Sequence, residues 1–230
     1  MTATEQPTTE ILRHGKIDLA LHHLRRDPVA DGAHTLLLLH GLGESSPTNL
    51  PPLVADWPGA VAALDFTGHG GSSVSHGGGY TAELLLADAD VALGTLTADD
   101  PSRAVTVLGR GLGAYTALQL AGSRPKLVRG AILADGPGLA GGPTGPTSQS
   151  FFSLATDGST PDPYALVELG RDLRPPDYAA SFVRLALGGS PLDEPIAVCA
   201  VIRPDWLTAV ANEHGVMNVS LAEALAAYAR

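Results

Sequence analysis

Three short segments of this chain are apolar almost without interruption, and they constrain its fold more than any other feature. They are residues 35–39, 60–64 and 104–108, and a fourth strand-like segment, "VRGAILAD", follows at 128–135. Strands covered on both faces have such runs, whereas strands with one solvated face alternate apolar and polar residues. Helical periodicity at 80–96 and 112–121 predicts helices between these strands. We therefore expect a mostly parallel α/β sheet flanked by helices on both faces.

The rest of the chain predicts further elements around this sheet. Alternating residues over 10–24, with Gly15 at the turn, indicate a hairpin. The stretch "GPGLAGGPTGPTSQS" at 136–150 has the Gly, Pro, Ser and Thr density of an irregular loop. Further expected elements are helices at 163–172 and 177–187, a late strand within 195–205 and a closing helix capped by Ser220.

The length of the chain indicates one domain. With 230 residues, 44% of them hydrophobic, it can bury a substantial core, and no internal repeat or second domain is apparent. The expected parts are a flexible tail over 1–10, an α/β core over 11–135 and 195–230, and a small helical lid inserted over 136–194, with a shortened C-terminal part of the sheet.

Composition excludes several classes of partner. A formal net charge of −10 argues against nucleic acid, which is bound by a basic face. No apolar run approaches the ~18–20 residues of a membrane span, and residues 1–10 lack a secretory signal pattern, so a cytoplasmic location is expected. The single cysteine, Cys199, is expected mid-strand as a small buried hydrophobe. We expect no cofactor and no metal, since the adjacent His22 and His23 point to opposite faces of a strand.

Three glycine-containing segments carry a resemblance to a known family. "LLLLHGLGE" (36–44) resembles the strand and oxyanion loop of the α/β-hydrolase superfamily, and "LDFTGHGGS" (64–72) resembles its D-x-x-G-x-G-x-S loop. "VTVLGRGLGAYTALQLA" (105–121) resembles its nucleophile elbow and the helix that follows. The order and spacing of the segments match as well. The resemblance covers residues 35–135 and implies an α/β-hydrolase-like fold.

The elbow departs from the family pattern at its centre. The superfamily has G-x-S-x-G there, with serine as the nucleophile, whereas this chain has Gly111. Gly109 and Gly113 are expected to let the backbones pass closely in the sharp turn. "GRGLGAY" is also similar to the elbow of the N-myc downstream-regulated family, hydrolase-like proteins without the triad. The resemblance thus implies the scaffold of a serine hydrolase without its attacking atom.

The resemblance implies Asp205 as the acid and His214 as the base of a triad. Only eight residues separate them, too few for the helix and strand that the family places there. Either the last strand is missing or the assignment is wrong. His214 as an ordinary surface histidine is an equally good interpretation.

The resemblance also implies an anion cradle that does not depend on a nucleophile. The backbone N–H groups of Leu42 and Leu112 would form the oxyanion hole. His40 and Gly41 belong to the same loop, which His40 would orient, and Arg110 precedes the apex of the elbow. Such a pocket would hold a carbonyl or carboxylate oxygen.

Polar side chains near the expected crevice have plainer interpretations. Asp65 and His69 follow a strand that ends at the crevice, and we favour loop anchoring over catalysis for both. Ser45 and Ser46 lie on the oxyanion loop, where turn hydrogen bonds are the favoured role.

Three functional hypotheses follow. The favoured one is a catalytically degenerate hydrolase-like protein that binds a small apolar or carbonyl- or carboxylate-bearing molecule, or a protein partner. The second is an atypical enzyme of esterase-like, lyase or cofactor-free oxygenase type, which uses Asp205 and His214 for acid–base chemistry. The third is a dinucleotide site, because "GRGLGA" fits G-x-G-x-x-[GA] and Asp135 follows the next strand.

Overall fold

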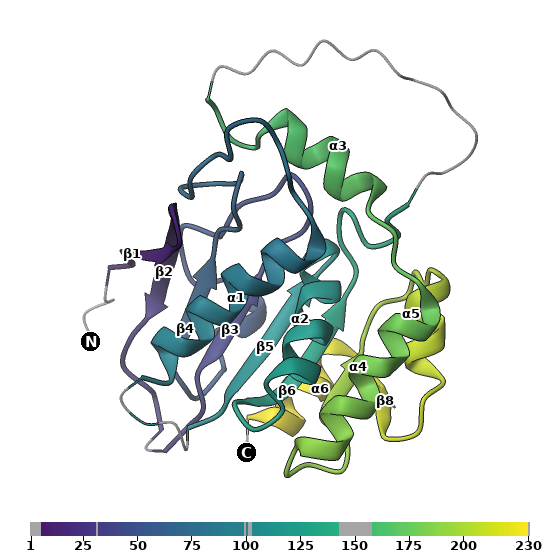
Figure 1. Cartoon of the computed structure of the whole chain (residues 1–230). Coiled ribbons are helices and arrows are strands. Elements are labelled where there is room, and N and C mark those ends of the chain that lie inside the picture. The colour runs from purple at the N-terminus through teal and green to yellow at the C-terminus, as the bar shows by residue number, and fades with distance from the viewer. Residues whose placement is uncertain (1–5, 31, 99, 101–102, 143–157, 230) are drawn as a thin grey trace.

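The computed structural model describes residues 6–30, 32–98, 100, 103–142 and 158–229. Within these residues, eight strands form one sheet in the order β1-β2-β4-β3-β5-β6-β7-β8 (Figure 1). Strand β2 is antiparallel to β1 and β4, and the remaining pairs are parallel. The strands are β1 (Thr8–His14), β2 (Ile17–Arg25), β3 (Leu36–Leu39), β4 (Val61–Leu64), β5 (Val105–Arg110), β6 (Val128–Ala134), β7 (Ile196–Val198) and β8 (Val216–Asn218).

The helices lie on both faces of this sheet, so the expected fold class is confirmed (Figure 1). Helices α1, α2, α4 and α5 pack against one another in sequence on one face. On the other face lie α6 and the short 3-10 helix η1. The helices are η1 (Pro52–Val54), α1 (Ala82–Leu96), α2 (Leu112–Ser123), α3 (Pro163–Arg171), α4 (Pro176–Gly189), α5 (Asp205–Ala211) and α6 (Leu221–Tyr228).

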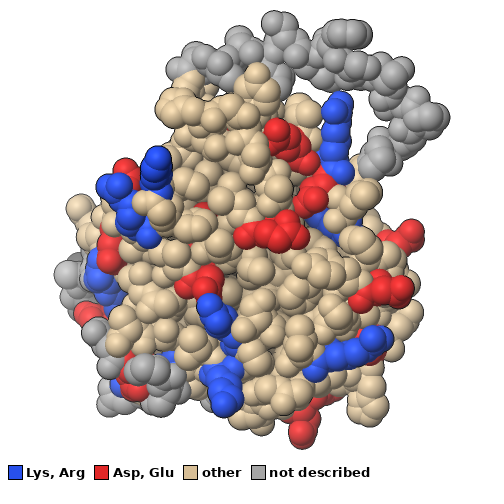
Figure 2. Space-filling view, viewed as in Figure 1, with Lys and Arg blue, Asp and Glu red and all other residues tan. Residues whose placement is uncertain are grey.

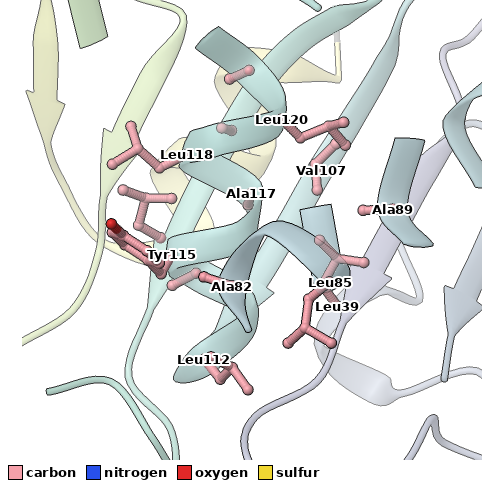
Figure 3. Packing of buried hydrophobic residues seen from close by; sticks show 14 of the residues in the cluster. Leu39, Ala82, Leu85, Ala89, Val107, Leu112, Tyr115, Ala117, Leu118 and Leu120 are labelled. Atoms are coloured by element: carbon pink, nitrogen blue, oxygen red, sulfur yellow. The ribbon is translucent and has the colours of Figure 1, made fainter. Parts of the chain in front are cut away.

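Strand β3 explains why the central strands are apolar without interruption. Leu37 and Leu39 belong to the core between the sheet and the α1–α2 layer, whereas Leu36 and Leu38 pack on the α6 side. Every residue of the strand therefore contacts protein, so no position suits a polar side chain. Figure 3 shows the larger core, in which Leu39 lies with residues of β5, α1 and α2.

The N-terminal hairpin differs from the expectation in where it begins. Gly15 turns the chain with φ +61°, as predicted, and β1 pairs with β2 from Thr8 onward. Residues 8–10, assigned above to the flexible tail, therefore belong to the sheet. Of the remaining residues of that prediction, 6 and 7 precede the strand without regular secondary structure, and 1–5 lie outside the described residues.

The two helices of the expected lid occupy different places. Helix α3 lies above the edge where the parallel strands end (Figure 1), and Leu166 approaches Gly43 of the loop after β3. Helix α4 instead packs against α2 and α5 in the helical layer. Part of the interval, 143–157, lies outside the described residues. The boundaries 136–194 thus stay a prediction, of which only α3 has the position of a lid.

The C-terminal part of the sheet is short, as expected, and it contains two strands. Strands β7 and β8 have three residues each, and β8 pairs in parallel with β7. Of the two alternatives given for the short interval between Asp205 and His214, a missing last strand is therefore excluded. Cys199 follows β7 rather than lying within it, and burial raises the pKa of its thiol to about 11. Ser220 caps α6 with a capping box, as predicted.

None of the helices in the described ranges has the length and apolar composition needed to cross a bilayer. On the face shown in Figure 2, acidic and basic side chains both occur and lie among uncharged residues.

Candidate functional site

The site is built around the sharp turn between β5 and α2. Gly111 stands at this turn with φ +58° and ψ −120°, a conformation that residues with a Cβ adopt only under strain. A Cβ on Gly109 would lie 2.1 Å from the Gly113 carbonyl oxygen, and one on Gly113 would lie 2.5 Å from that of Leu39. Both flanking glycines are therefore required by backbone contact, as expected from the elbow pattern.

The space in front of Gly111 is filled by the chain itself. The loop that follows β6, residues 136–139, passes directly over the turn, and we call it the plug loop. A Cβ on Gly111 would lie 2.0 Å from the Pro137 carbonyl oxygen and 2.6 Å from the Gly136 carbonyl carbon. Position 111 thus lacks a side chain and also the room for one.

The two backbone donors expected to form an anion cradle do converge. The N–H groups of Leu42 and Leu112 point at a common acceptor, 3.0 and 2.9 Å away. That acceptor is the carbonyl oxygen of Pro137. The cradle is therefore assembled, but a peptide oxygen of the same chain occupies it.

The plug loop is anchored from below by buried side chains. Arg174, which is 6% exposed, donates from Nη1 to the carbonyl oxygens of Gly138 and Leu139. Trp206 Nε1 donates to Leu139 O at 2.8 Å, and the Arg174 guanidinium lies 5.1 Å from the centre of the Tyr115 ring. Burial lowers the pKa of Arg174 to about 10, so the guanidinium stays charged at neutral pH.

His40 and Gly41 shape the loop after β3. His40 is buried, its Nδ1–H donates to Gly41 O at 2.8 Å, and its Nε2 accepts from Phe66 N–H at 3.1 Å. Burial lowers the pKa of His40, although the Gly41 carbonyl opposes this shift. With both ring nitrogens bonded to backbone, His40 orients the loop, the role that the resemblance implied.

Asp65 ties three segments together. It accepts from Ser46 N–H at 2.6 Å, Gly71 N–H at 2.7 Å and His22 Nε2–H at 3.0 Å. Burial of Asp65 raises its pKa, but the bonds from Gly71, Ser46 and His22 outweigh that effect and lower the pKa overall. This geometry favours the anchoring interpretation. The contact between Asp65 and His22 could not be read from the sequence.

His69 is likewise engaged by the loops. It accepts from Gly43 N–H at 3.2 Å and faces Thr67 O at the same distance with its other nitrogen. Burial, reinforced by the neighbouring His40, lowers the pKa of His69 to about 4. The imidazole is therefore neutral at physiological pH and holds the loop over residues 67–69 against Gly43.

Arg110, at the end of β5, lies beside the plug loop, since a Cβ on Gly136 would lie 3.2 Å from Arg110 Nε. Its Nη1 lies 3.1 Å from Glu44 Oε1, and Glu44 Oε2 accepts from Gly41 N–H at 2.9 Å. Leu112, by contrast, is fully buried in the core. Ser45 is exposed, and Ser46 contributes its backbone N–H to Asp65 as described above.

The structure does not bring Asp205 and His214 together. Asp205 begins α5 shortly after the carboxyl end of β7, whereas His214 lies beyond the other end of that helix, just before β8. His214 lines a surface hollow with residues of the segment that leads into β7, at the opposite edge of the sheet from Gly111. Their triad roles therefore have no geometric support.

The turn between β5 and α2 does not have the properties of a dinucleotide site. Pyrophosphate binding requires free N–H groups at the helix N-terminus. Here Leu112 N–H is bonded to Pro137 O, Gly113 N–H to His40 O and Ala114 N–H to Gly111 O. Asp135 accepts from the N–H groups of Val201 and Ile202, so it links two loops.

Two residues that define this site were not singled out in the sequence. Pro137 stands in the Gly- and Pro-rich stretch that signalled only an irregular loop, and Arg174 follows α3 with no motif around it. Among the described residues, no group of three or more His, Cys, Asp or Glu side chains is arranged to hold a metal ion.

Comparison with known proteins yields a family match. The model of the family described as serine aminopeptidase, S33, matches residues 31–155, more than half of the chain. No curated protein matches.

Several solved structures are similar over part of the chain. A probable hydrolytic enzyme from Pseudomonas aeruginosa is 24% identical, with a TM-score of 0.45 over 56% of this chain and 40% of that one. Epoxide hydrolase A from Mycobacterium thermoresistibile is 22% identical, with a TM-score of 0.43 over 56% of this chain and 38% of that one. An epoxide hydrolase from Vigna radiata is 18% identical, with a TM-score of 0.48 over 62% of this chain and 42% of that one. The matched region spans about two fifths of the length of these structures.

Proposed function

The chain belongs to the family described as serine aminopeptidase, S33, whose members share the α/β-hydrolase fold. From this premise we propose that it has the fold of a hydrolase but does not catalyse hydrolysis. It would act by binding a small apolar or carbonyl-bearing molecule, or a partner protein, rather than by hydrolysing an ester or amide.

One observation carries this proposal, namely the position of the Pro137 carbonyl oxygen. Acyl transfer needs backbone donors that are free to bind the oxyanion as it forms. Here both donors, Leu42 N–H and Leu112 N–H, are already bonded to Pro137. A substrate carbonyl would have to displace the Pro137 carbonyl, which accepts hydrogen bonds equally well and, as part of the same chain, is always beside the donors.

The absence of a side chain at Gly111 supports the same conclusion. A serine hydrolase needs a hydroxyl within reach of an imidazole base. Position 111 supplies none, and the nearby His40 and His69 have their ring nitrogens facing backbone groups. Loss of a triad nucleophile leaves at most about 10³–10⁴-fold acceleration over water, and that remainder comes largely from an open oxyanion hole and substrate binding.

Freeing the N–H groups of Leu42 and Leu112 would cost free energy, because the plug loop that bonds to them is anchored by other contacts. Its displacement breaks the bonds from Arg174 and from Trp206 Nε1. A neutral hydrogen bond contributes about 0.5–1.5 kcal/mol and one from a charged donor about 1.5–3 kcal/mol. We therefore expect the plug loop to leave the two donors only rarely.

The test is a direct assay for acyl transfer by the purified chain. We expect hydrolysis of p-nitrophenyl acetate and butyrate at the rate of the heat-denatured chain, and no stoichiometric labelling by a fluorophosphonate. His214→Ala and Asp205→Ala should change neither readout. Saturable turnover, together with a label on a residue at the carboxyl edge of the sheet, would overturn the proposal.

A further inference from the structure

A cavity of about 500 Å³ lies on the α6 side of the sheet, apart from the plug loop. Its floor is formed by the carboxyl ends of four parallel strands, and its walls by the segment between β3 and β4 and by the start of α6. Residues from each part are Leu38, Ala63, Leu108, Ala134, Leu53 and Leu221. This volume is within the range of natural small-molecule sites, which are mostly apolar with a few polar groups.

The cavity exists because the crossover from β3 to β4 is unusually irregular. Parallel strands are usually joined by an α-helix that covers the sheet. Within residues 40–60, all described, the structure has only the three-residue helix η1. The ends of the strands beneath it are incompletely covered, since Leu38 and Ala134 stay partly accessible. Long irregular connections in compact domains are often functional.

The cavity adjoins the hydrolase-like site, since His40 and Arg110 line it, but its lining does not include the plug loop. Gly111, Leu112 and Pro137 do not contribute to its lining. Leu112 is buried in the core on the α2 side of the sheet, whereas Leu108 and Ala63, which form the cavity floor, pack on the α6 side. A ligand here would leave the plug loop and its hydrogen bonds in place.

The polar groups at the mouth define the chemistry of a ligand. Two carboxylates and one guanidinium share the lining with uncharged polar groups; these residues are Glu44, Asp135, Arg110, His40, Ser45 and Ser46. The ion pair with Glu44 engages Nη1 of Arg110, a side chain with five N–H donors that is half exposed. An anionic head would approach two negative charges. A neutral oxygen that accepts a hydrogen bond from Arg110 meets no such repulsion.

We propose that this cavity binds a small, mainly apolar molecule with a neutral, hydrogen-bond-accepting head group such as a hydroxyl or an amide. The chain of the ligand would lie over the strand ends, between Leu108 and Leu221, with its head at Arg110. This rests on the proposed function, whose ligand class and binding site it names.

The experiment compares three molecules with the same chain and different heads. Binding of 1-octanol, octanoate and octylamine to the full chain is measured by calorimetry and by the shift in Tm. We expect octanol to bind saturably, at least tenfold more tightly than octanoate. Arg110→Gln removes the donor to the head group and should weaken octanol binding at least threefold, whereas Arg171→Gln, at an exposed position on α3, should not.

Two filling variants test the location. Ala134→Leu adds bulk at the floor and Leu221→Trp at the wall, and each should weaken octanol binding at least tenfold. Ala227→Leu, on the exposed side of α6 and outside the cavity lining, should leave binding unchanged. Circular dichroism checks that each variant is folded.

Two outcomes overturn the inference: no saturable binding of octanol, or octanol binding unaffected in folded filling variants. Tightest binding of octanoate or of octylamine overturns the assignment of the head group. Ester turnover is measured in the same samples with p-nitrophenyl butyrate. Turnover would contradict the proposed loss of catalysis, whereas loss of octanol binding contradicts only the cavity, so the two failures are distinguishable.

Discussion

The carbonyl oxygen of Pro137 lies 2.9 Å from the amide nitrogen of Leu112 and accepts its hydrogen bond. Leu42 N–H shares the same acceptor from the facing loop. In a working hydrolase such a pair of donors meets the substrate oxygen. In this chain the pair serves structure instead, since it fastens the loop after β6 to the N-terminus of α2 and to the loop after β3.

Gly111→Ser is expected to destabilise the fold and to confer no esterase activity. Its Cβ would collide with the plug loop, and its backbone conformation adds strain of about 1–3 kcal/mol. We expect the free energy of unfolding in urea to fall by about 2–5 kcal/mol in total.

Gly94→Ala is the matched control for this change. Gly94 lies exposed within α1, with open space around its Cα, so alanine should raise the free energy of unfolding by about 0.5–1 kcal/mol. A serine at position 111 with wild-type stability would contradict the close contact with Pro137.

Arg174→Met should loosen the plug loop. The change keeps much of the apolar bulk but removes the charged donors to Gly138 O and Leu139 O. We expect a loss of about 2–5 kcal/mol in the free energy of unfolding. Hydrogen exchange at Leu42 and Leu112 should become at least tenfold faster.

Arg171→Met serves as the control for Arg174, because Arg171 is exposed at the end of α3. It should leave both exchange rates and stability within about 0.5 kcal/mol of wild type. Unchanged exchange in Arg174→Met would show that the plug loop is held by other contacts.

Acid should destabilise the protein through His69. Its pKa is lowered to about 4 in the folded state, against 6.5 ordinarily. A group with a depressed folded pKa contributes stability above pH 6.5 that is lost as the pH falls to about 4, since the unfolded state binds the proton first. Burial also lowers the pKa of His40, so His40 likewise contributes stability that is lost as the pH falls.

Urea unfolding at several pH values measures this effect. His69 should account for about 2–4 kcal/mol of the loss between pH 7.5 and pH 4. His69→Gln should flatten the dependence, and His76→Gln, at an exposed position, should follow the wild type. Identical slopes in both variants would exclude His69 as a source of acid lability.

Tyr80→Phe should loosen the N-terminal end of α3. The Tyr80 hydroxyl donates to Asp162 Oδ2 at 2.6 Å, and Asp162, the N-cap of α3, is 1% exposed. Removing this donor to a buried carboxylate should cost about 1.5–3 kcal/mol. Faster hydrogen exchange over 162–171 is the local readout. Tyr164→Phe, a more exposed tyrosine of α3, should show neither effect.

Much of the fold was predictable because each signal was local. The continuous apolar runs require cover on both faces, and β3 meets that requirement residue by residue. Gly109 reflects a contact within the turn itself, whereas Gly113 reflects a contact with Leu39 O on the neighbouring strand β3, and the elbow pattern signalled both. Strand β7 was predicted within 195–205, but the three residues of β8 carry too little periodicity to be recognised. Strand β8 was therefore missed, and the role of His214 stayed open between a base and a surface histidine.

The sequence by itself determined the α/β class, the glycine turn between β5 and α2, and the lack of a side chain at the position where the family carries its nucleophile. Only the tertiary structure decided that Pro137 fills the donor pair, that Arg174 anchors it, and that Asp205 and His214 lie at opposite ends of α5. The physical reason is that these relationships depend on where separate loops meet in space. Hydrogen bonds between such loops leave no periodic pattern in the sequence, whereas burial of a strand or helix face does.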